Sequence, residues 1–180
     1  MMAIFALSLF ATADAQQQPA QAYFNQGSFS LQTYAGYMAD VTNRSVRNAG
    51  ATVGIGYYLL ENVGLNIEAT GCYVDEPGPN TFGGGINLLL RHHLMVRPNW
   101  SFFIDVGPGF LEAKRDVPPN GTRFNITFRT GPGFTYKLDE HMHLLIGGHF
   151  VHQSNARMWG SDRNPSVNGL EGYIGLMFTF

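Results

Sequence analysis

Charged residues are scarce in this sequence. Only 13% of its 180 residues are charged, where a soluble domain usually carries about 25%, and the formal net charge is -2. A chain with so little positive charge has no electrostatic basis for binding nucleic acid, so we expect no nucleic-acid partner. Lysine is rare and there are 22 glycines, a combination that argues against a helical bundle.

Long apolar runs and cysteine pairs are also missing. No run approaches the roughly 18 apolar residues of a membrane-spanning helix, which excludes a helical membrane anchor. The single cysteine, Cys72, cannot form an internal disulfide, so the chain is not a cystine-stapled secreted module. The length suits one domain.

The N-terminal segment differs from the rest of the chain. Residues 3–11 form a short apolar block, and Ala13, Asp14 and Ala15 lead from it into a glutamine run. This is the layout of a secretory signal peptide, although no Lys or Arg precedes the apolar block. We therefore expect a signal peptide over residues 1–15, a linker over 16–27 and a folded domain over 28–180.

From Ser28 onward, apolar residues recur with a period of two, which predicts β-strands. About eight strands can be counted, the first over about Phe29 to Asp40 and the last over about Gly169 to Phe180. The opposite parity carries mainly glycine and a few charged residues. Its charged members include Glu68, Arg91, Asp105 and Arg129.

Two barrel types fit alternating strands, and they differ in which face is polar. A soluble barrel needs a charged outer surface, whereas a membrane barrel turns its apolar face to lipid and its polar face inward. The polar parity has too few charges to cover a water-facing surface, but small residues with a few pairable charges suit a narrow, filled lumen. The sequence therefore predicts an all-β fold, an eight-stranded antiparallel up-and-down transmembrane β-barrel.

The connections and the C-terminus agree with this fold. Short turns are expected at Asp75–Asn80, Arg97–Asn99 and Leu138–Glu140, and longer loops over residues 41–47, 114–121 and 156–168. The chain ends in Tyr-x-Gly-x-x-Phe-x-Phe, which resembles the C-terminal assembly signal of bacterial outer-membrane proteins. The expected location is the bacterial outer membrane, with its lipids as neighbours.

A candidate site lies at the end of the seventh expected strand. There an apolar, lipid-facing column ends in His152 and Ser154, whose Cα atoms are about 6.6 Å apart if the strand is regular. An imidazole that takes the proton of a serine hydroxyl makes it a nucleophile, and a carboxylate can fix the tautomer of the ring. Glu171, at the start of the next strand, is the candidate carboxylate.

At these positions the sequence resembles a known enzyme family. His152-Gln153-Ser154-Asn155-Ala156 and Gly169-Leu170-Glu171 are similar to the His-x-Ser-Asn-Ala and Gly-Ile-Glu elements of the lipid A 3-O-deacylases, the PagL family. The resemblance implies an outer-membrane barrel that hydrolyses the ester-linked acyl chain at position 3 of lipid A. It also implies Ser154 as nucleophile, His152 as general base and acid, and Glu171 as the orienting carboxylate.

This chain departs from the family pattern in three ways. Arg157 stands where the family usually has glycine, and the following loop is longer. Glu171 has the parity of the lumen-facing residues, so it can reach the outer face only if a bulge near Gly172 reverses its direction. Asp162 is the alternative acid, and Asn155 is a candidate for holding the oxyanion or positioning the substrate.

The expected function is thus an outer-membrane serine esterase that acts on lipid A in lipopolysaccharide, without a cofactor or metal. The alternative is a non-catalytic eight-stranded barrel with a structural or adhesion role, in which His152 and Ser154 are rim residues. The sequence leaves open whether the protein forms a homodimer.

Overall fold

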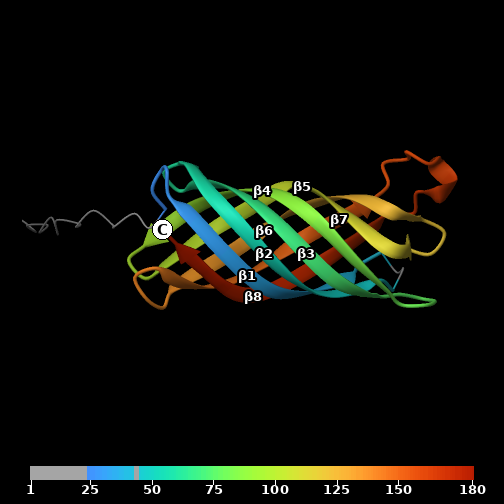
Figure 1. The fold of residues 1–180 in the computed structure, drawn as a ribbon, viewed down its shortest axis with the longest axis horizontal. Helices are drawn as coiled ribbons and strands as arrows, with labels where there is room; N and C mark the ends of the chain where they lie inside the picture. Colours follow the sequence, from blue (N-terminus) through green and yellow to red (C-terminus); the bar gives the residue numbers. More distant parts are fainter. Residues whose placement is uncertain (1–23, 43–44) are drawn as a thin grey trace, which may run out of the picture.

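The computed structural model describes residues 24–42 and 45–180, which form one closed antiparallel barrel of eight strands in sequential order (Figure 1). The expected signal peptide lies outside the described residues. No helix in the described part of the chain is long and apolar enough to cross a membrane. The elements are β1 (Phe29–Asp40), β2 (Arg47–Leu60), β3 (Val63–Asp75), β4 (Thr81–Arg97), β5 (Trp100–Val117), β6 (Thr122–Lys137), β7 (Met142–Ser154), the short 3-10 helix η1 (Ser161–Arg163) and β8 (Val167–Thr179).

The predicted fold class is confirmed, and the two faces of each strand have the predicted polarity. On β5, Asp105 is fully buried inside the barrel while its neighbours Ile104 and Val106 are exposed outside. Every strand presents large apolar side chains on the outer surface. One from each strand, in order, is Leu31, Val53, Ile67, Leu88, Val106, Phe128, Ile146 and Ile174. Such an exterior is stable only in contact with lipid.

Side chains rather than open space fill the lumen. Arg91 donates two hydrogen bonds of 2.8 Å to Asp105 and a third, of 2.9 Å, to Gln32. Gln32 and Tyr34 in turn donate to the buried carboxylate of Glu68. Arg91 and Asp105 thus form an ion pair, and Glu68 accepts hydrogen bonds from neutral donors, so the barrel encloses these groups with their hydrogen bonds made.

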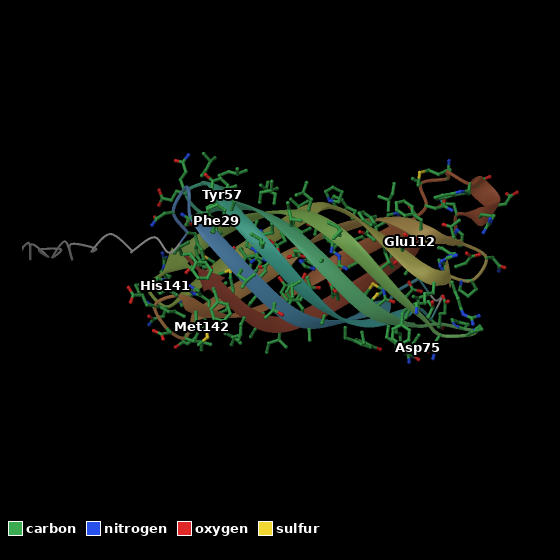
Figure 2. The ribbon with its side chains drawn as sticks, in the orientation of Figure 1. Phe29, Tyr57, Asp75, Glu112, His141 and Met142 are labelled. Atoms are coloured by element: carbon green, nitrogen blue, oxygen red, sulfur yellow. The ribbon has the colours of Figure 1, made fainter. Side chains whose placement is uncertain are left out.

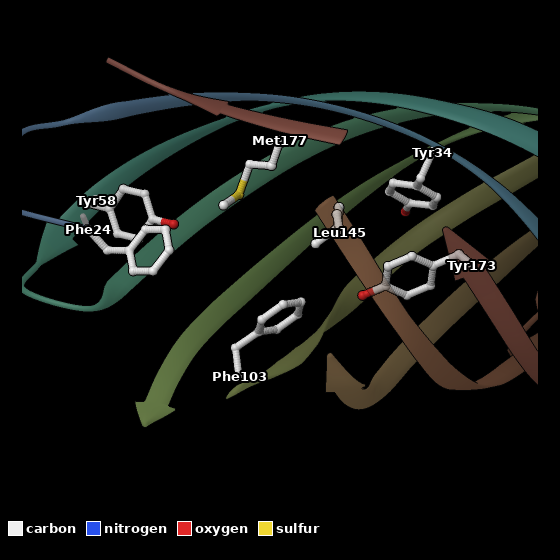
Figure 3. Packing of buried hydrophobic residues seen from close by; sticks show 7 residues of the cluster. All are labelled: Phe24, Tyr34, Tyr58, Phe103, Leu145, Tyr173 and Met177. Carbon is white, nitrogen blue, oxygen red and sulfur yellow. The ribbon is translucent and has the colours of Figure 1, made fainter. Parts of the chain in front are cut away.

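An apolar cluster packs inside the barrel (Figure 3) and extends from Tyr34, near the middle of β1, to Met177, near the end of β8. Phe24 belongs to it and stacks on the His93 ring at 3.7 Å between centroids. Phe24, which falls within the expected linker over 16–27, is therefore packed against the inside of the barrel. The cluster consists of Phe24, Tyr34, Tyr58, Phe103, Leu145, Tyr173 and Met177.

The connections divide between the two ends of the barrel. The connections β2–β3, β4–β5 and β6–β7 lie at the end that carries the C-terminus, and the other four lie at the opposite end (Figure 1). Figure 2 labels Asp75 and Glu112 at that opposite end, away from Phe29 and Tyr57. The Asp75–Asn80 turn therefore shares an end with the longer loops, because consecutive connections of an up-and-down barrel alternate between ends. In outer-membrane barrels the longer loops are extracellular.

Candidate functional site

His152 and Ser154 lie on the outer face at the loop end of β7, as the parity predicted. Both are half-buried, and Nε2 of His152 is 3.3 Å from Oγ of Ser154. Their cross-strand neighbours on β6 are Phe128 and Ile126, which are exposed on the same outer face. A serine–imidazole pair is thus set in an apolar strip at the loop end of the barrel's outer face.

The partner of the other ring nitrogen is an amide. Nδ1 of His152 is 2.7 Å from Oδ1 of Asn168, which is the residue directly opposite His152 in the β7–β8 register. Asn168 has the parity of the exposed residues Leu170 and Ile174, so a regular strand turns its side chain outward. Sequence patterns did not single out Asn168, although its parity and its position just before the Gly-Leu-Glu segment are visible in the sequence; in the structure it is the second residue of β8.

Glu171 does not orient His152, which corrects the expectation. The β7–β8 register runs without a bulge and pairs Glu171 with His149, so the side chain stays inside the barrel. There Glu171 forms an ion pair with Arg129 and lies 3.0 Å from Nδ1 of His149. The bulge that an outward Glu171 requires is absent from the continuous ladder.

The two other predicted site residues have structural positions. Asn155 is almost fully buried, with its Oδ1 accepting a hydrogen bond from the Arg157 backbone and its backbone N–H donating to Asn164. The Nδ2 group, which an oxyanion would need as donor, donates to the backbone carbonyl of Arg163. These bonds tie down the loop after β7, so Asn155 is not free to bind an oxyanion. Asp162 is exposed on η1, and its side-chain contact is with Ser161 rather than His152.

The loop after β7 also shapes the outer face beside the site. Ala156 and Arg157 have φ values of 51° and 62°, the left-handed region that glycine adopts at little cost. Farther on, Trp159 packs edge-on against Phe124, which lies two residues from the Ser154 neighbour Ile126 on β6. The loop therefore flanks the apolar strip.

Within residues 24–42 and 45–180, no three His, Cys, Asp or Glu side chains are grouped so that they could hold a metal ion. The described site thus consists of one hydroxyl, one imidazole and one amide. This arrangement can move a proton from Ser154 to His152 and so supports nucleophilic acyl transfer.

The architecture and the apolar exterior define the class: the chain is an eight-stranded outer-membrane β-barrel. No protein-family profile and no curated protein sequence matches it. Among solved structures it is similar to Neisserial surface protein A, at a TM-score of 0.67 and 13% identity over 86% of this chain and 100% of that one.

Two barrels from Pseudomonas aeruginosa are also similar. OprG matches at a TM-score of 0.60 and 14% identity over 87% of this chain and 97% of that one. The N-terminal barrel domain of OprF matches at a TM-score of 0.59 and 14% identity, over 86% of this chain and 98% of that one. At these identities the likeness concerns the fold. Together with the lipid-facing exterior, the shared fold places the protein in the bacterial outer membrane.

Proposed function

We propose that this protein is a serine esterase of the outer membrane that hydrolyses an acyl ester of an outer-leaflet lipid, the 3-O-linked acyl chain of lipid A. The observation that carries the proposal is the 3.3 Å contact between His152 Nε2 and Ser154 Oγ on the outer face. A lumen-facing pair would have no route to lipid. The similarity of residues 152–156 to the lipid A 3-O-deacylases is the basis for proposing lipid A as the substrate.

In the proposed reaction, Ser154 Oγ attacks the ester carbonyl while His152 Nε2 takes its proton. The tetrahedral intermediate collapses as His152 returns the proton to the leaving sugar hydroxyl, which leaves the acyl chain on Ser154. Water, deprotonated by His152, then releases the fatty acid. The acyl chain lies along the apolar strip that includes Ile126 and Phe128, so the substrate enters sideways from the membrane.

The first experiment measures release of 3-hydroxy fatty acid from lipopolysaccharide by purified, assembled protein in detergent. Ser154→Ala and His152→Asn should each abolish turnover, and the double variant should be no worse, since the two residues act as one unit. Barrel assembly should be unchanged, because neither side chain packs in the lumen.

The lumen offers a matched control. Ser101 Oγ lies 2.8 Å from Nδ1 of His93, a similar pair that lipid cannot reach. Ser101→Ala should therefore keep full turnover per assembled barrel. Undiminished turnover in assembled Ser154→Ala would exclude the esterase. No release by the wild-type protein would favour the non-catalytic barrel with a structural or adhesion role.

A further inference from the structure

We infer that Asn168, rather than a carboxylate, is the positioning residue that holds His152 in the tautomer needed for catalysis. The inference rests on the proposed function and names the third member of that site. Its basis is the 2.7 Å distance between Asn168 Oδ1 and His152 Nδ1, together with the 3.3 Å distance from His152 Nε2 to Ser154. The imidazole thus lies between the amide and the hydroxyl.

The chemistry of the amide sets the proton positions on the ring. A carboxamide oxygen only accepts hydrogen bonds, so the nitrogen that faces it must carry the hydrogen. Nδ1 of His152 is therefore the donor, and Nε2 of the neutral ring keeps its lone pair. That lone pair faces Ser154 Oγ, which is the arrangement a general base needs.

Asn168 is well placed to hold the ring still. It sits directly across the β7–β8 ladder from His152, between the lumen-facing residues Val167 and Gly169. Its backbone carbonyl accepts a 2.7 Å hydrogen bond from the Val41 N–H, which fixes this end of β8 to the end of β1. The backbone of Asn168 is thus held between β7 and β1, which fixes the point from which its side chain reaches His152.

The acidic side chains considered for this role are engaged elsewhere. Glu171 lies inside the barrel with Arg129 and His149, and Asp162 is exposed on η1. An amide can orient the imidazole as the Asn of Cys-His-Asn proteases does, although it stabilises the developing imidazolium less than a carboxylate. The site is therefore a Ser-His-Asn arrangement.

The test compares three variants of the full-length protein by steady-state lipopolysaccharide deacylation. Asn168→Ala should lower kcat about 100-fold with KM nearly unchanged, because the ring loses its fixed tautomer while the lipid-binding strip is intact. Asn168→Asp should restore turnover. It should also move the acid limb of the kcat/KM profile to higher pH by about one unit, since a carboxylate favours the imidazolium. Glu171→Gln, measured per assembled barrel, should keep wild-type kcat.

The outcomes separate this inference from the proposed function. If assembled Asn168→Ala keeps the wild-type kcat while Ser154→Ala is inactive, the role of Asn168 is overturned. The same conclusion follows if Asn168→Asp is as impaired as Asn168→Ala and its pH profile is unshifted. If assembled Glu171→Gln loses turnover while Asn168→Ala keeps wild-type turnover, the Glu171 carboxylate and not Asn168 orients His152. If Ser154→Ala is fully active, the proposed function itself fails.

Discussion

Glu171 shows how the surroundings of one residue decide its role. It lies inside the barrel between Arg129 and the nearly fully buried His149, whose other nitrogen is 3.5 Å from Asp105. Through His149 this group connects to the Arg91–Asp105 ion pair. Removing the carboxylate therefore leaves a cation in the lumen without its counter-charge, which costs more than the pair itself contributes.

We expect Glu171→Ala to lower the free energy of unfolding by about 3 kcal/mol, because Arg129 is left uncompensated in a mostly enclosed site. Glu171→Gln should cost clearly less, since its amide oxygen can still accept hydrogen bonds from Arg129 and His149. Urea-induced unfolding in lipid vesicles measures both. Equal stability of Glu171→Ala and the wild type would contradict the lumen network.

At the scale of the strand, alternation determines which chemistry a position tolerates. Strand β5 carries Asp105 and Gly107 on the lumen side and Val106 on the lipid side. A Cβ on Gly107 would come within 1.9 Å of the Leu88 carbonyl oxygen, so the glycine permits close approach of β4 and β5. The same alternation on β7 puts His152 and Ser154 outside and His149 inside.

Val106 lies near the middle of β5 and faces outward, so Val106→Arg should cost about 2 to 4 kcal/mol, the cost of an arginine facing lipid near the bilayer midplane. Val106→Leu is the matched control and should be nearly neutral, because it keeps an apolar side chain against lipid. Folding into vesicles, followed by urea titration, gives both values. If Val106→Arg proved as stable as Val106→Leu, the assignment of this face to lipid would be wrong.

At the scale of the whole molecule, the barrel closes where β1 meets β8. At one end of this seam Phe29 and Phe180 exchange backbone hydrogen bonds of 3.2 and 2.9 Å. The cavity near the loop end, lined by residues that include Arg129, Gln153 and Glu171, has a volume of about 30 Å³. That space suits one or two water molecules and is too small for an acyl chain.

Deleting Phe180 should prevent assembly, because it removes both hydrogen bonds at the end of the seam and the terminal residue of the predicted assembly signal. The measurement is the heat-modifiable, protease-resistant band of the folded barrel in outer-membrane fractions. Phe180→Tyr, which keeps the backbone bonds and an aromatic ring, is the control and should assemble. A wild-type amount of folded Phe180 deletion variant would refute the expectation.

The sequence by itself determined the strand count, the lipid-facing parity and the outward placement of His152 and Ser154, because a period of two assigns each residue to a face without knowledge of its partners. The same parity predicts that Glu171 lies inside the barrel. The expectation that Glu171 orients His152 came from the similarity of Gly169-Leu170-Glu171 to a family motif, and it was wrong. Only the tertiary structure decided what meets His152. The pairing of β7 with β8 sets Asn168 opposite His152 and Glu171 opposite His149. That register depends on contacts around the whole closed barrel and on the length of the loop between the strands, which no local pattern encodes.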